Sequence, residues 1–240
     1  VFCGVGILFV GKLQLPALLA MTIASFVASA TSHALGLEKF AHFVNVSLTF
    51  NAWLFCKLAL LGLIFGLVGN AFAALLAYAK QKAKEVMDNH YYRILFGGIV
   101  LSLLFLMLYH GRYSGLGTNL IDASFSGKVI YFYDWLLKLV LTIATLAIGF
   151  QGGEVTPLFA IGASLGVVLA KVFGLPVEFV AAAGYISVFG SATNTLLAPI
   201  FIGGEVFGFA NLPYFALVMI FAYSLNRNHS IYTGQEVLDF

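Results

Sequence analysis

The chain carries few charged residues for its length. Lys, Arg, Asp and Glu make up 9% of its 240 residues, and the formal net charge is only +2. An ordinary soluble domain has about a quarter of its residues charged, so this composition would not cover the surface of a globular fold. Because no extended Lys/Arg tract occurs either, the charge pattern gives no indication of a nucleic-acid partner.

Cysteine is also rare, and its two positions form no functional pattern. Cys3 and Cys56 lie in apolar surroundings, without a CxxC spacing and without a nearby histidine. We therefore expect neither a disulfide framework nor a metal site. The sequence also lacks HExxH and complete nucleotide-binding motifs, which argues against an enzyme.

Apolar residues, in contrast, are abundant. They make up 61% of the chain, with 24 Phe and 11 Tyr, and the mean hydropathy is +1.00. Several apolar runs reach the roughly 18 to 20 residues that a helix needs to cross a bilayer. Divided at polar or Gly/Pro-rich points, they predict about eight helices, over residues 13–34, 52–79, 93–110, 131–149, 156–173, 177–190, 195–209 and 212–226. We therefore predict an all-α integral membrane protein that crosses the cell membrane several times, in contact with the lipid bilayer.

Several of these predicted helices are too short for a simple crossing. The later ones are separated by breaks such as Gly152-Gly153 and Gly203-Gly204. Lipid cannot satisfy irregular backbone, so broken helices inside a membrane occur where protein encloses a cavity, as in transporters. We expect tilted, partly broken or re-entrant helices around an internal path.

Basic residues indicate the orientation of the chain. The densest basic cluster contains Lys80, Lys82, Lys84 and Arg93. Because short basic loops face the cytoplasm, we place this cluster there. Counting crossings from it puts the polar loop 111–130 outside and the carboxy terminus in the cytoplasm.

A few charged residues fall inside apolar segments, where a charge is costly unless it is paired, neutralised or hydrated. Asp134 and Lys138 lie four positions apart on one predicted helix, so we expect them to neutralise each other across a turn. Glu154 and Glu205 have no such neighbour. Each is either a hydrogen-bonded structural acid or a participant in proton movement.

The most informative stretch runs from Gly152 to Gly166 and reads GGEVTPLFAIGASLG. Glycines permit unusual backbone angles, and Pro157 suits the first turn of a helix. We predict an irregular junction over 152–157 that opens a helix at Val155 or Thr156, within the membrane depth. The amides of Glu154, Val155 and Thr156, with the positive end of the helix dipole, could then bind an anion. The alternative is a Gly-kinked junction with no ligand.

This stretch resembles the signature of the CLC family, in which GxFxP opens a half-helix that points its amides at the central anion, and a GAxxG run follows. The matching residues are Gly153, Pro157, Gly162, Ala163 and Gly166. Val155 stands where the signature has Phe. The sequence GGEVTP is similar to the same stretch in the fluoride/proton antiporter branch of the family.

Two later segments carry the same resemblance. Residues 228–235 resemble the family's final helix, whose opening tyrosine reaches the central anion, and Tyr232 is the matching position. Residues 191–208 resemble a later interface helix of the family. The resemblance therefore implies a role for Tyr232 in anion binding and a homodimer contact near 191–208.

The resemblance covers most of the second half of the family's core, which is built from two inverted halves. The first-half motifs are missing, including the helix of the external gate glutamate. We therefore predict that residues 1–240 form one transmembrane domain, the carboxy-terminal half of a CLC-type core. The amino-terminal half is absent, and we expect a longer polypeptide.

The resemblance implies secondary transport, with fluoride export coupled to proton import. The anion would be held by the amides at 154–156, by the Thr156 hydroxyl and by Tyr232, and Glu154 could carry protons. No cofactor is needed. Two alternatives stay open, a chloride channel or chloride/proton exchanger on the same scaffold, and a non-transporting membrane scaffold.

Overall fold

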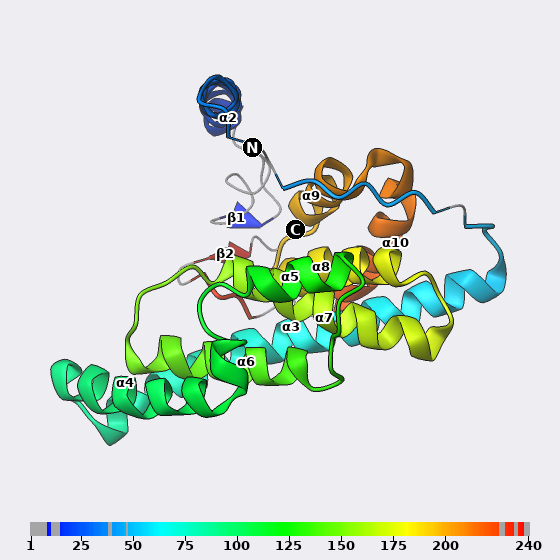
Figure 1. Cartoon of the computed structure of the whole chain (residues 1–240). Coiled ribbons are helices and arrows are strands. Elements are labelled where there is room, and N and C mark those ends of the chain that lie inside the picture. The colour runs from blue at the N-terminus through cyan, green and yellow to red at the C-terminus, as the bar shows by residue number, and fades with distance from the viewer. Residues whose placement is uncertain are drawn as a thin grey trace.

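A computed structural model of the chain describes residues 9–10, 15–37, 40–46, 48–225, 229–232 and 235–237. It confirms the prediction of an all-α fold (Figure 1). The α-helices are α2 Leu15–Ala34, α3 Ala52–Val86, α4 His90–Met107, α5 Thr118–Phe125, α6 Asp134–Ile148, α7 Val155–Phe173, α8 Val177–Ala192, α9 Leu197–Phe207 and α10 Leu212–Ser224. Two 3-10 turns, η1 Tyr109–Gly111 and η2 Phe209–Asn211, join them, and two-residue strands, β1 Phe9–Val10 and β2 Glu236–Val237, pair in parallel.

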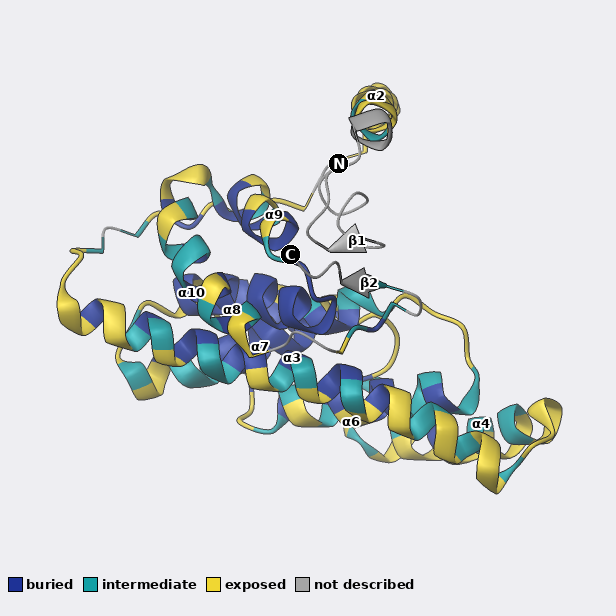
Figure 2. Cartoon of the chain, turned by 180° about the vertical axis from the view of Figure 1, so that it is seen from behind, coloured by how far each residue is buried: buried dark blue, intermediate teal, exposed yellow. Residues whose placement is uncertain are grey.

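Among the described residues, three helices, α3, α4 and α7, are long and apolar enough to cross a membrane. Helix α4 packs little of its surface against the rest of the chain, since only Leu101 of its residues is buried (Figure 2). Helix α2 lies apart from the packed helices in both views. These outward apolar faces are what a lipid environment or a further packed segment would cover.

The core forms around α7 and α8, which pack side by side in opposite directions. Every residue of α8 from Phe179 to Ala192 is buried (Figure 2). The two helices touch backbone to backbone, because a Cβ atom on Gly162 would lie 2.1 Å from the carbonyl oxygen of Gly184. Glycine at these positions therefore sets the close spacing of the two helices.

Helix α3 packs across this pair through small residues. A Cβ on Gly69 would meet the carbonyl oxygen of Val188 in α8 at 2.5 Å, and one on Gly62 would meet that of Val218 in α10 at 2.4 Å. Helices α3, α7, α8 and α10 thus form one block of closely packed backbones. The α7 start lies on this rigid support.

The predicted helix boundaries required three corrections. Helix α3 continues to Val86, so Lys80, Lys82 and Lys84 lie on its last turns and not in a loop. The segment predicted over 195–209 is the shorter helix α9 followed by η2. Helix α5 was missed, because its sequence is short and includes polar residues, so it forms no long apolar run.

The predicted neutralisation of Asp134 by Lys138 is wrong. Asp134 pairs instead with Arg112 at 2.7 Å and accepts a hydrogen bond from the Tyr113 hydroxyl at 2.6 Å. The Lys138 ammonium donates to the backbone carbonyls of Tyr113 and Gly115, at 3.0 and 2.6 Å. Both buried charges therefore tie the chain after α4 onto α6, and both do so in part through Tyr113.

Candidate anion site at the start of helix α7

The predicted irregular junction before α7 is confirmed, although a different glycine ends the preceding helix. Its position within the membrane depth stays a prediction. Helix α6 ends at Ile148, and Gly149 follows in the left-handed region with φ of +118°. That angle favours glycine, and Gly149 is the C-cap whose N–H donates to the Thr145 carbonyl. Gly152 and Gly153 lie in the irregular stretch beyond it and do not have positive φ angles. Helix α7 then begins at Val155, as predicted.

The first turn of α7 leaves amides available for a ligand. The Glu154 carbonyl accepts the Leu158 amide at 3.3 Å, and Pro157 has no N–H. The N–H groups of Val155 and Thr156 therefore come before the first intrahelical bond. Residues 152–153 are exposed and 154–156 are half-buried, so this turn faces away from the packed core. Such a helix start, with its positive dipole end, is suited to an anion.

Glu154 has a partner that sequence reasoning missed. Its carboxylate lies 3.1 Å from the Lys80 ammonium, on the last turns of α3. The Glu154 side chain is 19% exposed and that of Lys80 is 43% exposed, so the ion pair sits at the edge of the packed region. The pair joins the start of α7 to α3 and places a lysine beside the candidate anion site. Because 74 positions separate the two residues, no local pattern could have indicated it.

The tail that contains Tyr232 lies against the end of α8. The Ile231 amide donates to the Ala192 carbonyl at 3.0 Å, and Tyr232 is half-buried against the main core. Thr233 and Gly234 of the predicted final-helix motif lie outside the described residues.

The packing of α7 on α8 relates this tail to the α7 start. Gly162 faces Gly184, and the helices run in opposite directions. Eight positions before Gly162 is Glu154, and eight positions after Gly184 is Ala192. At the same rise per residue along both helices, the α7 start lies level with the end of α8 that holds the tail. The proximity of the Tyr232 and Thr156 hydroxyls stays a prediction.

The sequence predicted neither a metal site nor a disulfide framework. The structure describes only some of the residues that this prediction concerns. Cys56 is an exposed free thiol, and Cys3 lies outside the described residues. Within the described ranges, no three His, Cys, Asp or Glu side chains come together as metal ligands would. The start of α7 therefore offers two backbone amides beside one ion pair.

Packed short helices and apolar outer faces are typical of a multi-pass membrane protein. The chain belongs to the voltage gated chloride channel family, whose model matches residues 5–227. The predicted family is therefore confirmed.

Two relatives are similar to this chain over nearly its whole length. The structure is similar to the crystal structure of a CLC-type fluoride/proton antiporter, with 56% sequence identity and a TM-score of 0.97, over 99% of this chain and 60% of that chain. The sequence is 32% identical to a chloride/fluoride channel protein of Pseudomonas syringae pv. tomato, over 98% of this chain and 53% of that protein. The chain thus spans between half and two thirds of either relative.

Proposed function

We propose that the full-length protein exports fluoride in exchange for protons, with the transported anion bound at the start of α7. The observation that carries this proposal is the GGEVTP junction, at which α7 begins with the Val155 and Thr156 amides ahead of its first intrahelical bond. The likeness to a CLC-type fluoride/proton antiporter supports fluoride as the ion and protons as its exchange partner. The relevant assay is fluoride efflux from liposomes with simultaneous measurement of proton flux.

A chloride channel or exchanger on the same scaffold is the second candidate. The relative from Pseudomonas syringae is named a chloride/fluoride channel protein, so chloride transport should be measured beside fluoride transport. Efflux of fluoride and of chloride from the same liposomes separates the two candidates. Faster chloride efflux without proton movement would contradict fluoride/proton exchange.

Removing one hydroxyl from the anion site should slow transport strongly. We expect Thr156→Ala and Tyr232→Phe each to reduce anion affinity or flux by roughly ten- to a hundred-fold, since each removes one donor to a desolvated anion. Ser164→Ala is the matched control, because Ser164 lies on the same helix but its hydroxyl donates to the Ala160 carbonyl at 2.6 Å. Flux at the unaltered rate in both site variants would place the anion elsewhere.

Glu154 is proposed as a proton-linked residue, and Glu154→Gln tests that role. The change keeps the shape of the side chain and removes its charge, so fluoride flux should continue while the accompanying proton flux is lost. If the carboxylate serves only to pair with Lys80, the ratio of the two fluxes will stay as in the unaltered protein. Glu85→Gln is the control, because Glu85 forms a comparable pair with Lys82 in which both side chains are about half exposed.

Orientation and assembly complete the proposal. The lysines at the end of α3 favour a cytoplasmic location for the α3–α4 connection, which also places the carboxy terminus in the cytoplasm. The apolar face of α9, with Leu197 and Phe201 exposed, is the proposed homodimer contact. Labelling of single cysteines from one side of the membrane tests the proposed orientation. The mass of the solubilised protein tests the proposed homodimer.

A further inference from the structure

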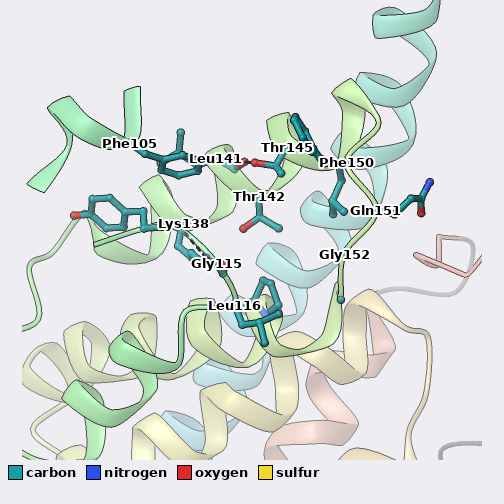
Figure 3. Close-up of a pocket in the computed structure, with 14 residues that line it drawn as sticks. Phe105, Gly115, Leu116, Lys138, Leu141, Thr142, Thr145, Phe150, Gln151 and Gly152 are labelled. Atoms are coloured by element: carbon teal, nitrogen blue, oxygen red, sulfur yellow. Dashed lines mark hydrogen bonds between the residues drawn. The ribbon is translucent and has the colours of Figure 1, made fainter. Parts of the chain in front are cut away.

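A pocket lies between α6, the chain after α4 and the junction before α7. Its volume is about 210 Å³, and it is lined by Lys138 and Thr142 of α6, by Gly115, and by Gly152 and Gly153 of the junction (Figure 3). This volume exceeds what one water-sized sphere occupies by an order of magnitude. The pocket can therefore hold a small ion together with part of its hydration shell.

Lys138 brings an unbalanced positive charge to this pocket. Its side chain is 1% exposed, and its ammonium donates to two carbonyls, of Tyr113 and Gly115. In the part of the chain that the structure describes, no carboxylate lies within ion-pair distance of it, because Asp134 is paired with Arg112. A buried ammonium balanced only by carbonyl dipoles is costly, and an anion beside it would offset that cost.

Thr142, one turn after Lys138, supplies an independent indication of a ligand. The residue is only 8% exposed and lines the pocket, yet its hydroxyl has no hydrogen-bond partner among the described residues. A threonine inside a helix commonly donates to the carbonyl four residues earlier, and Thr145 on the same helix does so, to Leu141 at 2.7 Å. In the view of Figure 3, Thr142 lies between Lys138 and Gly152. An unpaired hydroxyl in this position is a donor for a bound ion.

We propose that this pocket binds a small monovalent anion of the halide type between the Lys138 ammonium and the Thr142 hydroxyl. Lys138 supplies the charge and its third N–H, and Thr142 supplies a neutral donor on the same side of α6. Apolar side chains such as Phe105 and Leu116 line other parts of the pocket.

The pocket adjoins the first turn of α7, since Pro157, Gly152 and Gly153 lie on its wall. Its two proposed ligands, Lys138 and Thr142, belong instead to α6. It is therefore a second ion position beside the proposed transport site. The inference goes beyond the proposed function, since it holds whether the transported ion is fluoride or chloride.

Bromide is a suitable probe, because its anomalous scattering locates it in crystals of the full-length protein. We expect an anomalous peak within about 3.5 Å of both the Lys138 ammonium and the Thr142 hydroxyl. Thr142→Val keeps the shape of the side chain and should weaken bromide binding in this pocket about tenfold, because one donor to an ion is lost. Thr142→Ser should restore it.

Thr145→Val is the matched control, since Thr145 lines the same pocket on the same helix but its hydroxyl is already bonded to Leu141. Its peak should equal that of the unaltered protein. The absence of a peak in this pocket overturns the inference whatever the α7 start shows. Equal peaks in Thr142→Val and the unaltered protein overturn it as well. A peak at the α7 start alone supports the proposed transport site and not this one, so the two proposals fail separately.

Discussion

Replacing Gly162 with alanine will destabilise the full-length protein by about 3 kcal/mol, at the upper end of the range for overpacked sites. The new Cβ would lie 2.1 Å from the carbonyl oxygen of Gly184 and 2.6 Å from its carbon. Both atoms belong to the backbone of α8, so no side-chain rotation can make room, and the two central helices must move apart. Thermal denaturation of the purified, detergent-solubilised protein measures the loss.

Gly152→Ala is the matched control for this substitution. The change is chemically identical, but a Cβ on Gly152 would meet nothing within 4 Å, and its φ angle is not in the left-handed region. Its thermal midpoint should stay close to that of the unaltered protein. If both variants unfold at the same temperature, the close contact of α7 with α8 does not exist as described.

Replacing Asp134 with alanine should cost about 3 to 5 kcal/mol of stability, as expected when one partner of a buried ion pair is removed. Asp134 is fully buried and accepts hydrogen bonds from Arg112, from the Tyr113 hydroxyl and from the Tyr131 amide. The substitution leaves all three donors without this acceptor. The expected result is loss of folded protein during purification or a markedly lower thermal midpoint.

The electrostatics of the segment between η1 and α5, which holds Arg112 and Tyr113, agree with this expectation. Burial, and then the hydrogen bond to Asp134, raises the pKa of the Tyr113 phenol, so it remains a donor at physiological pH. The hydrogen bond to the same carboxylate raises the pKa of Arg112. The matched control is Glu85→Ala, which removes an exposed carboxylate paired with Lys82 at 2.6 Å and should cost less than about 1 kcal/mol. Equal losses in the two variants would contradict the central role of Asp134.

The candidate site is assembled from segments far apart in the chain. The first turn of α7 supplies amides, α3 supplies Lys80, and the end of α8 holds the tail that carries Tyr232. All three are supported by the same block of closely packed helices. A change in helix spacing at Gly162 would therefore also be expected to disturb the relative positions of the ligand groups.

Much of the architecture could be predicted from the sequence. The scarcity of charge and the long apolar runs indicated a membrane protein, and the break at GGEVTP with Pro157 indicated where α7 begins. These features are local, because glycine and proline act on their own backbone angles and an apolar helix is recognisable from its own residues. The resemblance to the family was first recognisable in the same short stretches, and the family model matches residues 5–227.

Only the tertiary structure shows which side chains that are far apart in the sequence come into contact. Asp134 lies four positions from Lys138 and was expected to pair with it. It pairs instead with Arg112, and Lys138 donates to the carbonyls of Tyr113 and Gly115. Likewise, Glu154 pairs with Lys80 across 74 positions. Sequence spacing specifies neighbours along one helix, whereas the partner of a buried charge depends on how helices pack. That packing is decided by backbone contacts such as the one between Gly162 and Gly184.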